Sequence, residues 1–177
     1  PCGRYRDLLI FYIIMSSTLS LIKKAYKAAP ALRAAEDKLL KKILLMIADE
    51  LEKQQESLLK ANRKDVAKQD PANPRTDRLR LDPQRIKNIA ASIRKVSRLP
   101  NPSNQIIERK KLPNGLLLEK RSVPLGVVGA VFEPRPNVVF DIAVLCIRSG
   151  NACVLKGSGE AAHSNIAAVS IIHAALK

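Results

Sequence analysis

One short polar turn carries the side chains of this sequence that are best placed for chemistry. In the turn EPRPN, residues 133–137, the guanidinium of Arg135 can bind a carboxylate or a phosphate through paired hydrogen bonds. The same guanidinium can equally pair with Glu133 or with Asp141 in its own neighbourhood. The two prolines fix φ and hold the residues before them extended, so a strand must stop here and Asn137 can stand where the next element starts.

A strand and a helix must position this turn. Leu125 to Phe132 is a valine-rich apolar run without polar alternation, which predicts a strand buried on both faces of a parallel sheet. Residues 138–149 are predicted to form a helix, and Ser149-Gly150 favours a left-handed end to it. The spacing predicts an apolar helix face made of Val138, Ile142, Leu145 and Cys146.

A second strand and a second helix follow directly. Residues 152–155 are predicted to form a buried strand, residues 157–159 a flexible Gly-Ser-Gly turn, and residues 160–176 a helix with Glu160 in its first turn. The order is therefore β-α-β-α. Ligands of open parallel α/β sheets bind beyond the carboxyl ends of the strands, so we expect them at turns 133–137 and 156–160.

The same region resembles a known family. The segment VPLGVVGAVFEPRPNVVFDIAVLCIRSGNACVLKGSGEAAHSN is similar to the cofactor-domain core of the gamma-glutamyl phosphate reductases, a proline-biosynthesis family within the aldehyde dehydrogenase superfamily. The similarity extends back through LPNGLLLEKRSVPLG, TDRLRLDPQRIKNIAASIRKV and LLKANRKDV, and so covers most of the chain after Met15. It implies an α/β fold with amino-terminal helices, a β-hairpin and the first β-α-β-α units of an aldehyde-dehydrogenase-like, Rossmann-like cofactor domain. The family's enzymes are considerably longer, so we expect an amino-terminal part of such an enzyme with an incomplete domain.

The resemblance gives Asn137 a catalytic role. It places this residue where the superfamily has an asparagine that helps to form the oxyanion hole, and a donor placed where negative charge develops lowers the reaction barrier. The local alternative is a helix cap, in which the Asn137 side chain accepts from the free N–H groups of the helix that begins at Val138. Arg135 is the expected substrate-binding residue, through the carboxylate or the phosphate of the substrate.

The resemblance also places a cofactor site for NADP after the second strand. It implies that Lys156 contacts the adenosine ribose and approaches the 2′-phosphate, while the alternative is a solvated loop lysine. Ser158 and Glu160 complete the expected site, although Glu160 also suits the amino terminus of its own helix. The family has Gly-Gly-Ser-Glu after the basic residue, whereas this chain has Gly-Ser-Gly-Glu. The chain has no Gly-x-Gly-x-x-Gly fingerprint, which this superfamily does not use.

The formal net charge of +15 raises the question of nucleic-acid binding. Residues 121–177 hold only five basic and three acidic residues, so nearly all of the excess lies in the amino-terminal part. There it is interspersed with acids, as in LLKKILLMIADELEKQQ, and aromatic residues that could stack on bases make up 3% of the chain. This distribution favours solvated helix faces, and we expect no nucleic-acid partner.

The cysteines and histidines predict neither a metal site nor a disulfide framework. Three cysteines occur without a CxxC pair, and His163 and His173 lie too far apart to share a helix face as ligands. Cys146 and Cys153 fall at apolar positions, where cysteine behaves as a small hydrophobe rather than as a reactive thiol. The catalytic cysteine of the family is therefore expected outside this chain.

The remaining sequence divides into four predicted regions. Residues 1–14 do not match the family and are too short to span a bilayer, so we interpret them as a leader before a start at Met15 of a cytoplasmic protein without a membrane partner. Residues 15–104 are predicted to be helical, residues 105–122 to form a hairpin, and residues 123–177 to begin the NADP-binding domain.

Within the helical region, proline positions predict the helix boundaries. Pro30 is expected to separate a helix over 20–29 from one over 31–67, and Asp82-Pro83 is expected to start another, which ends near Val96. The predicted inward residues of these two helices are Leu39, Ile43, Ile47, Leu51, Ile86, Ile89, Ala90 and Ile93. The hairpin is predicted to turn at Pro113-Asn114-Gly115.

Taken together, the resemblance implies NADPH-dependent reduction of L-glutamyl 5-phosphate to L-glutamate 5-semialdehyde by a homo-oligomeric enzyme. In that reaction a thiolate displaces phosphate to form a thioester, and hydride transfer then releases the aldehyde. This chain alone is expected to be inactive. The alternatives are another aldehyde dehydrogenase, which would not need phosphate, and a noncatalytic basic binding or assembly module, which would retain RNA in a salt-sensitive way.

Overall fold

The structure, a computed structural model, describes residues 11–12, 18–73 and 75–176. Its helices are α1 (Thr18–Arg33), α2 (Asp37–Lys53), α3 (Gln55–Val66), α4 (Thr76–Leu79), α5 (Pro83–Arg98), α6 (Asn137–Arg148) and α7 (Ala162–Ala175). Its strands are β1 (Phe11–Tyr12), β2 (Ile106–Lys111), β3 (Leu117–Arg121), β4 (Val127–Phe132) and β5 (Ala152–Gly157), and a short 3₁₀ turn, η1 (Gly159–Ala161), precedes α7.

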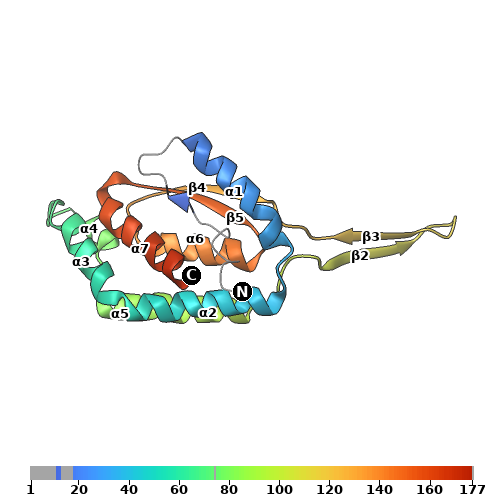
Figure 1. Cartoon of the computed structure of the whole chain (residues 1–177), viewed down its shortest axis with the longest axis horizontal. Coiled ribbons are helices and arrows are strands. Elements are labelled where there is room, and N and C mark those ends of the chain that lie inside the picture. The colour runs from blue at the N-terminus through green and yellow to red at the C-terminus, as the bar shows by residue number, and fades with distance from the viewer. Residues whose placement is uncertain (1–10, 13–17, 74, 177) are drawn as a thin grey trace.

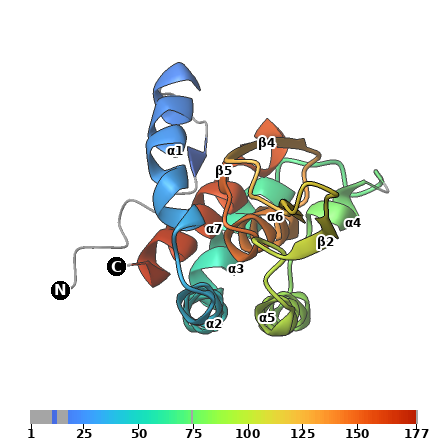
Figure 2. The same cartoon turned by 90° about the vertical axis from the view of Figure 1, so that its right-hand side faces the viewer.

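A parallel sheet forms the centre of the fold. Its strand order is β1-β5-β4, and the register runs from Val127 opposite Ala152 to Phe132 opposite Gly157. Helix α1 covers one face of the sheet, α6 and α7 cover the other, and the α2–α5 pair lies beneath α6 and α7 (Figures 1 and 2). The predicted β-α-β-α order is confirmed. Part of the predicted leader, residues 11–12, pairs with β5, and the rest of the leader and Met15 lie outside the described residues.

The prediction that both strands are buried is right for β5 and wrong for β4. Four consecutive residues of β5, from Ala152 to Leu155, are buried. In β4, by contrast, Val131 is 84% exposed, and Leu125, which lies before the strand, is 86% exposed. The reason is position: β5 lies between two strands, whereas β4 is an edge strand of the sheet that the structure describes.

Proline positions predict one helix boundary correctly and another wrongly. Asp82 caps α5, since its Oδ1 accepts from the backbone N of Arg85 at 2.7 Å, and Pro83 is the first helical residue. Pro30, however, lies inside α1 and does not separate two helices. The hydrogen bond that it cannot make would go to the carbonyl of Tyr26, on a solvent-facing side of the helix where water can replace it.

The long helix predicted over 31–67 is also divided. It breaks between Arg33 and Asp37 and again at Gln54, whose φ of −99° and ψ of 17° are not helical. The inward residues predicted for α2 and α5 are buried except Leu39, which is half-buried. Arg94 of α5 bridges to Asp49 and Glu52 of α2 at 2.7 Å each, so one arginine pairs with two acidic side chains across this helix pair.

The two helices that flank the strand ends differ in detail from the prediction. Helix α6 ends before Gly150, whose φ of +73° confirms the left-handed stop. Of the predicted apolar face only Cys146 is buried, because Val138 and Ile142 are half-buried and Leu145 is 52% exposed. The buried face consists of Val139, Phe140, Ala143, Val144, Cys146, Ile147 and Arg148. Helix α7 begins at Ala162 rather than at Glu160, because η1 occupies residues 159–161.

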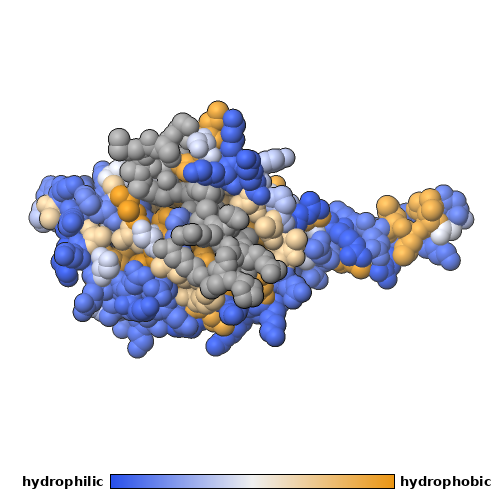
Figure 3. Space-filling model, in the orientation of Figure 1, coloured by the Kyte–Doolittle hydropathy of each residue, from blue (hydrophilic) through white to orange (hydrophobic). Residues whose placement is uncertain are grey.

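The predicted hairpin is confirmed and projects from the body of the molecule (Figure 1). Its turn closes with Leu112 N donating to the Leu116 carbonyl at 2.8 Å, and Gly115 adopts a φ of +87°. Leu116, Leu117 and Leu118 near its tip are each more than half exposed, and the tip is hydrophobic in Figure 3. Among the described residues, no helix is long and apolar enough to cross a membrane.

Candidate functional site

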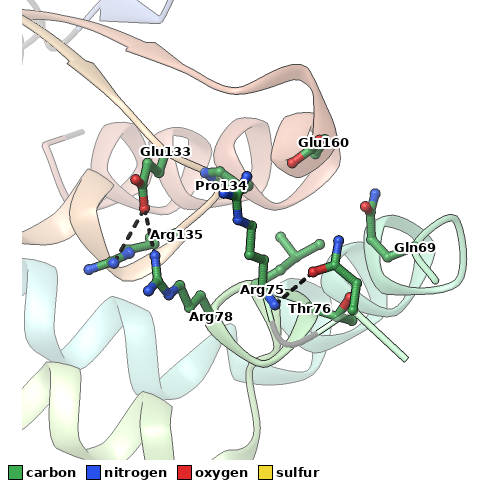
Figure 4. A pocket seen from close by; sticks show the side chains of 10 residues that line it. Gln69, Arg75, Thr76, Arg78, Glu133, Pro134, Arg135 and Glu160 are labelled. Carbon is green, nitrogen blue, oxygen red and sulfur yellow. Dashed lines mark hydrogen bonds and ion pairs between the residues drawn. The ribbon is translucent and has the colours of Figure 1, made fainter. Parts of the chain in front are cut away.

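The parallel register brings the two predicted turns together. Because Phe132 lies opposite Gly157, the residues that follow β4 and β5 leave the sheet at the same edge. A pocket of about 270 Å³ opens there, and Figure 4 shows its lining. The pocket is lined by Gln69, Asn73, Arg75, Thr76, Arg78, Leu79, Glu133, Pro134, Arg135 and Glu160.

Arg135 lies in this pocket and is paired within the chain. Its Nη2 lies 3.3 Å from Oε2 of Glu133, which is one of the two local pairings that the sequence suggests. The same Oε2 lies 3.2 Å from Nη1 of Arg78, which arrives from α4. The other suggested partner, Asp141, is engaged elsewhere. One carboxylate oxygen therefore holds two guanidinium groups at the pocket wall (Figure 4).

Asn137 does not cap its helix. Pro136 occupies the cap position, and Asn137 is the first helical residue, so its side chain does not reach the free N–H groups of the first turn. Its Nδ2 instead donates to Oδ2 of Asp141, one turn further along, at 3.0 Å. Burial raises the pKa of Asp141, and the hydrogen bond from Asn137 opposes this effect. The capping alternative is therefore wrong, and the amide stands at the carboxyl edge of the sheet, held by Asp141.

The three residues expected to contact a cofactor lie along the end of β5. Lys156 is exposed, and among the described residues its Nζ makes only a 3.4 Å contact with the carbonyl of Gly157. Ser158 caps η1, with its Oγ accepting from the backbone N of Glu160 at 3.3 Å. Glu160 is exposed and reaches the wall of the pocket. A free cation, a hydroxyl and a carboxylate are groups suited to the phosphates and ribose hydroxyls of a dinucleotide.

Two arginines of the pocket were not predicted. Arg75 and Arg78 come from the segment around α4, which lies against the turn after β4 although 55 residues separate Arg78 from Glu133. The sequence carries one signal for them. The segment TDRLRL, which contains Arg78 and directly follows Arg75, belongs to the family resemblance.

A buried network fixes the start of α7, and it too was not predicted. Asp65 of α3 is 1% exposed, and its Oδ2 accepts from Ser164 N at 2.7 Å and from Ser164 Oγ at 2.6 Å. Its Oδ1 accepts from His163 Nδ1 at 2.6 Å and from His163 N at 3.2 Å. Asn62, also on α3, donates to Ser164 Oγ at 3.0 Å and to the Leu79 carbonyl at 2.8 Å. Through these hydrogen bonds, helix α3 thus fixes the positions of α7 and α4 relative to each other.

The two described cysteines are unsuited to nucleophilic catalysis. Cys146 and Cys153 are free thiols that are both buried, as predicted. The neighbouring Cys146 and burial both raise the pKa of Cys153 far above its ordinary value. Within the residues that the structure describes, no group of three or more His, Cys, Asp or Glu side chains could hold a metal ion.

Comparison with known proteins identifies the family. Residues 16–176 match the aldehyde dehydrogenase family along nearly the whole chain. The chain belongs to the aldehyde dehydrogenase family. The parallel sheet and its helices are therefore part of an aldehyde dehydrogenase fold, and the resemblance noted in the sequence is confirmed.

Several similar members of the aldehyde dehydrogenase family are named gamma-glutamyl phosphate reductase. A gamma-glutamyl phosphate reductase from Chlorobium chlorochromatii is 46% identical over 151 residues, which are 85% of this chain and 36% of that protein. One from Pelodictyon phaeoclathratiforme is 49% identical over 141 residues, 80% of this chain and 34% of that protein. The crystal structure of a gamma-glutamyl phosphate reductase from Thermotoga maritima aligns with a TM-score of 0.85 at 33% identity, covering 89% of this chain and 39% of that one. The chain thus spans about a third of the length of these curated relatives.

Proposed function

We propose that the protein containing this chain reduces L-glutamyl 5-phosphate to L-glutamate 5-semialdehyde with NADPH, a step of proline biosynthesis. The observation that carries the proposal is the match to gamma-glutamyl phosphate reductases, at 46% identity over 151 residues in one of them. The family match over residues 16–176 also spans the edge of the sheet at which Arg135, Asn137 and Lys156 lie. The chain contributes the amino-terminal helices (15–104), the hairpin (105–122) and the start of the cofactor domain (123–177), with 1–14 as a leader.

In this proposal Asn137 stabilises negative charge on the substrate. Its Nδ2 carries two hydrogens, of which one is donated to Asp141 and the other remains for the developing oxyanion. Asp141 fixes the orientation of the amide, which is the preorganisation that such a donor requires. Arg135, two residues earlier, supplies a positive charge for the carboxylate or the phosphate of the substrate.

Lys156, Ser158 and Glu160 would hold NADP at the end of β5. When bound, the cofactor supplies a hydride, and the residues of this chain bind and orient it. The exposed ammonium of Lys156 forms no ion pair within the described part of the chain, so it is available to a 2′-phosphate. The hydroxyl of Ser158 accepts from Glu160 N and can still donate a hydrogen bond to the ligand.

The nucleophile of the proposed reaction is a thiolate that is not among the described residues. It would attack the acyl carbon of the substrate, so that a carbon–sulfur bond forms and the bond to phosphate breaks. Hydride transfer to the thioester carbon would then release the aldehyde and the thiolate. We also propose a cytoplasmic homo-oligomer in which the projecting apolar hairpin tip contacts another subunit.

The reverse reaction tests this function. The whole protein that carries this chain is given glutamate 5-semialdehyde, inorganic phosphate and NADP⁺, and the appearance of NADPH is followed by absorbance. We expect NADPH formation that requires phosphate. Asn137→Ala should lower kcat about 100-fold or more, whereas the exposed Asn88→Ala on α5 should leave it unchanged.

Each alternative function predicts a different result. Oxidation that proceeds equally without phosphate would indicate another aldehyde dehydrogenase. Salt-sensitive retention of RNA without NADPH binding would indicate a basic binding module.

A further inference from the structure

The charges that line the pocket at the sheet edge are not those of a simple anion site. Three arginines, Arg75, Arg78 and Arg135, face two glutamates, Glu133 and Glu160, so the wall carries both signs with one net positive charge. The arginines come from two segments that meet only in the folded chain, one around α4 and one directly after β4. A ligand that complements this wall carries both a negatively charged and a positively charged group.

The arginines retain free binding capacity. Charge-assisted hydrogen bonds are optimal at about 2.7–2.9 Å, whereas Arg78 and Arg135 lie 3.2 Å and 3.3 Å from the single oxygen that they share. Nε of Arg135 is buried and has no hydrogen-bond partner among the described residues. Arg75 takes part in no ion pair within the same residues, and its side chain extends toward Pro134 in Figure 4.

Glu133 supplies negative charge to the pocket wall, beside the arginines. Its side chain is 64% exposed, and only its Oε2 is engaged by the two arginines, so Oε1 remains free to accept from a ligand. A pure phosphate site would gain nothing from a carboxylate at its centre, because like charges repel. An ammonium group, however, would be attracted to it while a carboxylate on the same ligand binds the guanidinium groups.

We infer that this pocket binds the α-amino-acid end of the substrate, with Arg78 and Arg135 holding the α-carboxylate and Glu133 accepting from the α-ammonium. The inference rests on the proposed function, since it concerns the glutamyl end of that substrate. The volume of about 270 Å³ lies below the range of about 300–1,000 Å³ for drug-sized ligands, so the pocket suits a small metabolite rather than a dinucleotide. Asn137 does not line the pocket, but it follows Arg135 by two residues and stands at the same edge of the sheet, so a ligand with its charged end in the pocket has its reacting end on the side of Asn137 in this inference.

Ligand titration of the whole protein that carries this chain, labelled with ¹⁵N and followed by NMR, tests the inference without catalysis. The probes are L-glutamate, glutarate, which lacks only the amino group, and inorganic phosphate. We expect L-glutamate to shift the amide signals of residues 75–79 and those of Glu133, Arg135 and Asn137. Because a hydrogen bond to a charged group is lost, glutarate should bind about 10-fold or more weakly.

Matched variants assign the roles of the charged side chains. Arg78→Gln should weaken L-glutamate binding about 10-fold or more, whereas Arg80→Gln, which changes an exposed arginine outside this pocket, should not. Glu133→Gln should abolish the difference between L-glutamate and glutarate. The dispersion of each spectrum shows that the variant is folded.

Two results would overturn the inference. One is phosphate binding at these residues with no preference for L-glutamate over glutarate, which would make the pocket a phosphate site. The other is the absence of any shift with L-glutamate up to its solubility limit. Both are independent of the reverse enzyme assay, so a failure of the pocket assignment and a failure of the proposed reductase activity remain distinguishable.

Discussion

Replacing Asp65 with alanine should loosen the start of α7 and, with it, the turn at the candidate cofactor site. The carboxylate accepts four hydrogen bonds from His163 and Ser164, and two of their donors are backbone N–H groups at the helix start. Ser164 is 0% exposed, so water cannot readily replace the lost partner. The residues just before these, Ser158 to Ala161, form the turn that would contact NADP.

The magnitude follows from two losses. Removing a helix cap costs about 1 kcal/mol of the free energy of unfolding, and up to about 2 kcal/mol in well-ordered sites. Leaving the buried donor of the Ser164 hydroxyl unsatisfied costs about 1–3 kcal/mol more. A total near 3 kcal/mol corresponds to a fall in Tm of roughly 6–12 °C for a chain of this size. Asp65→Asn keeps one acceptor oxygen and should lose less.

Urea denaturation followed by circular dichroism gives the free energy of unfolding, and hydrogen exchange shows where the loss lies. We expect the amides of residues 158–166 in Asp65→Ala to lose protection before those of β5. The control is Glu56→Ala, which removes an exposed carboxylate from the same helix. If Asp65→Ala and Glu56→Ala unfold within about 0.5 kcal/mol of the unaltered chain, the typical effect of surface substitutions, then this network does not anchor α7.

Three further predictions concern single side chains near the strand ends and the core. Gly157→Ala should lower the free energy of unfolding by about 1–3 kcal/mol, because the new Cβ would lie 2.3 Å from the side chain of Asn165. Gly159→Ala, whose new Cβ has no atom within 4 Å, should cost little. Equal midpoints of urea unfolding for the two variants would contradict this. Burial raises the pKa of Asp141 in the folded chain, so the folded state favours the neutral carboxyl. Stability is therefore lost as the pH rises through that pKa and the group becomes charged. Asp141→Asn, which carries no charge, should raise Tm at pH 7 but not at low pH. Hydrogen bonds from Lys41 and then Arg148 lower the pKa of Asp37 in the folded chain. The stability that the charged Asp37 contributes is therefore present above its ordinary pKa of 3.8 and is lost as the pH falls through the lowered pKa. Asp37→Asn should lower Tm at pH 7 and flatten the decline of Tm in acid, which thermal scans at a series of pH values would show.

Local chemistry in the sequence was enough to predict most element boundaries near the site. The prolines of the turn 133–137 end β4, Asp82-Pro83 starts α5, and Gly150 ends α6, because each acts through its own φ angle or through hydrogen bonds within a few residues. The β-α-β-α order followed in the same way, and with it the expectation that the ligand edge lies where the strands end.

Tertiary surroundings determined the structure at the positions where local sequence rules predicted it wrongly. Pro30 was expected to break a helix, yet α1 runs through it, since the lost hydrogen bond faces solvent. Leu145 was expected to be inward and β4 to be buried on both faces, but burial depends on which neighbours cover a surface. Asn137 was a candidate cap, yet it stands one position inside its helix and donates to Asp141.

The sequence by itself determined the family, the order of the elements and the two turns that could bind ligands, because these depend on short motifs and on residues close together in the chain. Only the tertiary structure placed Arg78 beside Glu133 and Asp65 beside Ser164, which are 55 and 99 residues apart. Such pairs leave no periodic or local signal, since their geometry is fixed by the packing of α3 against α4 and α7. The character of the pocket, with both signs of charge, arises from that packing.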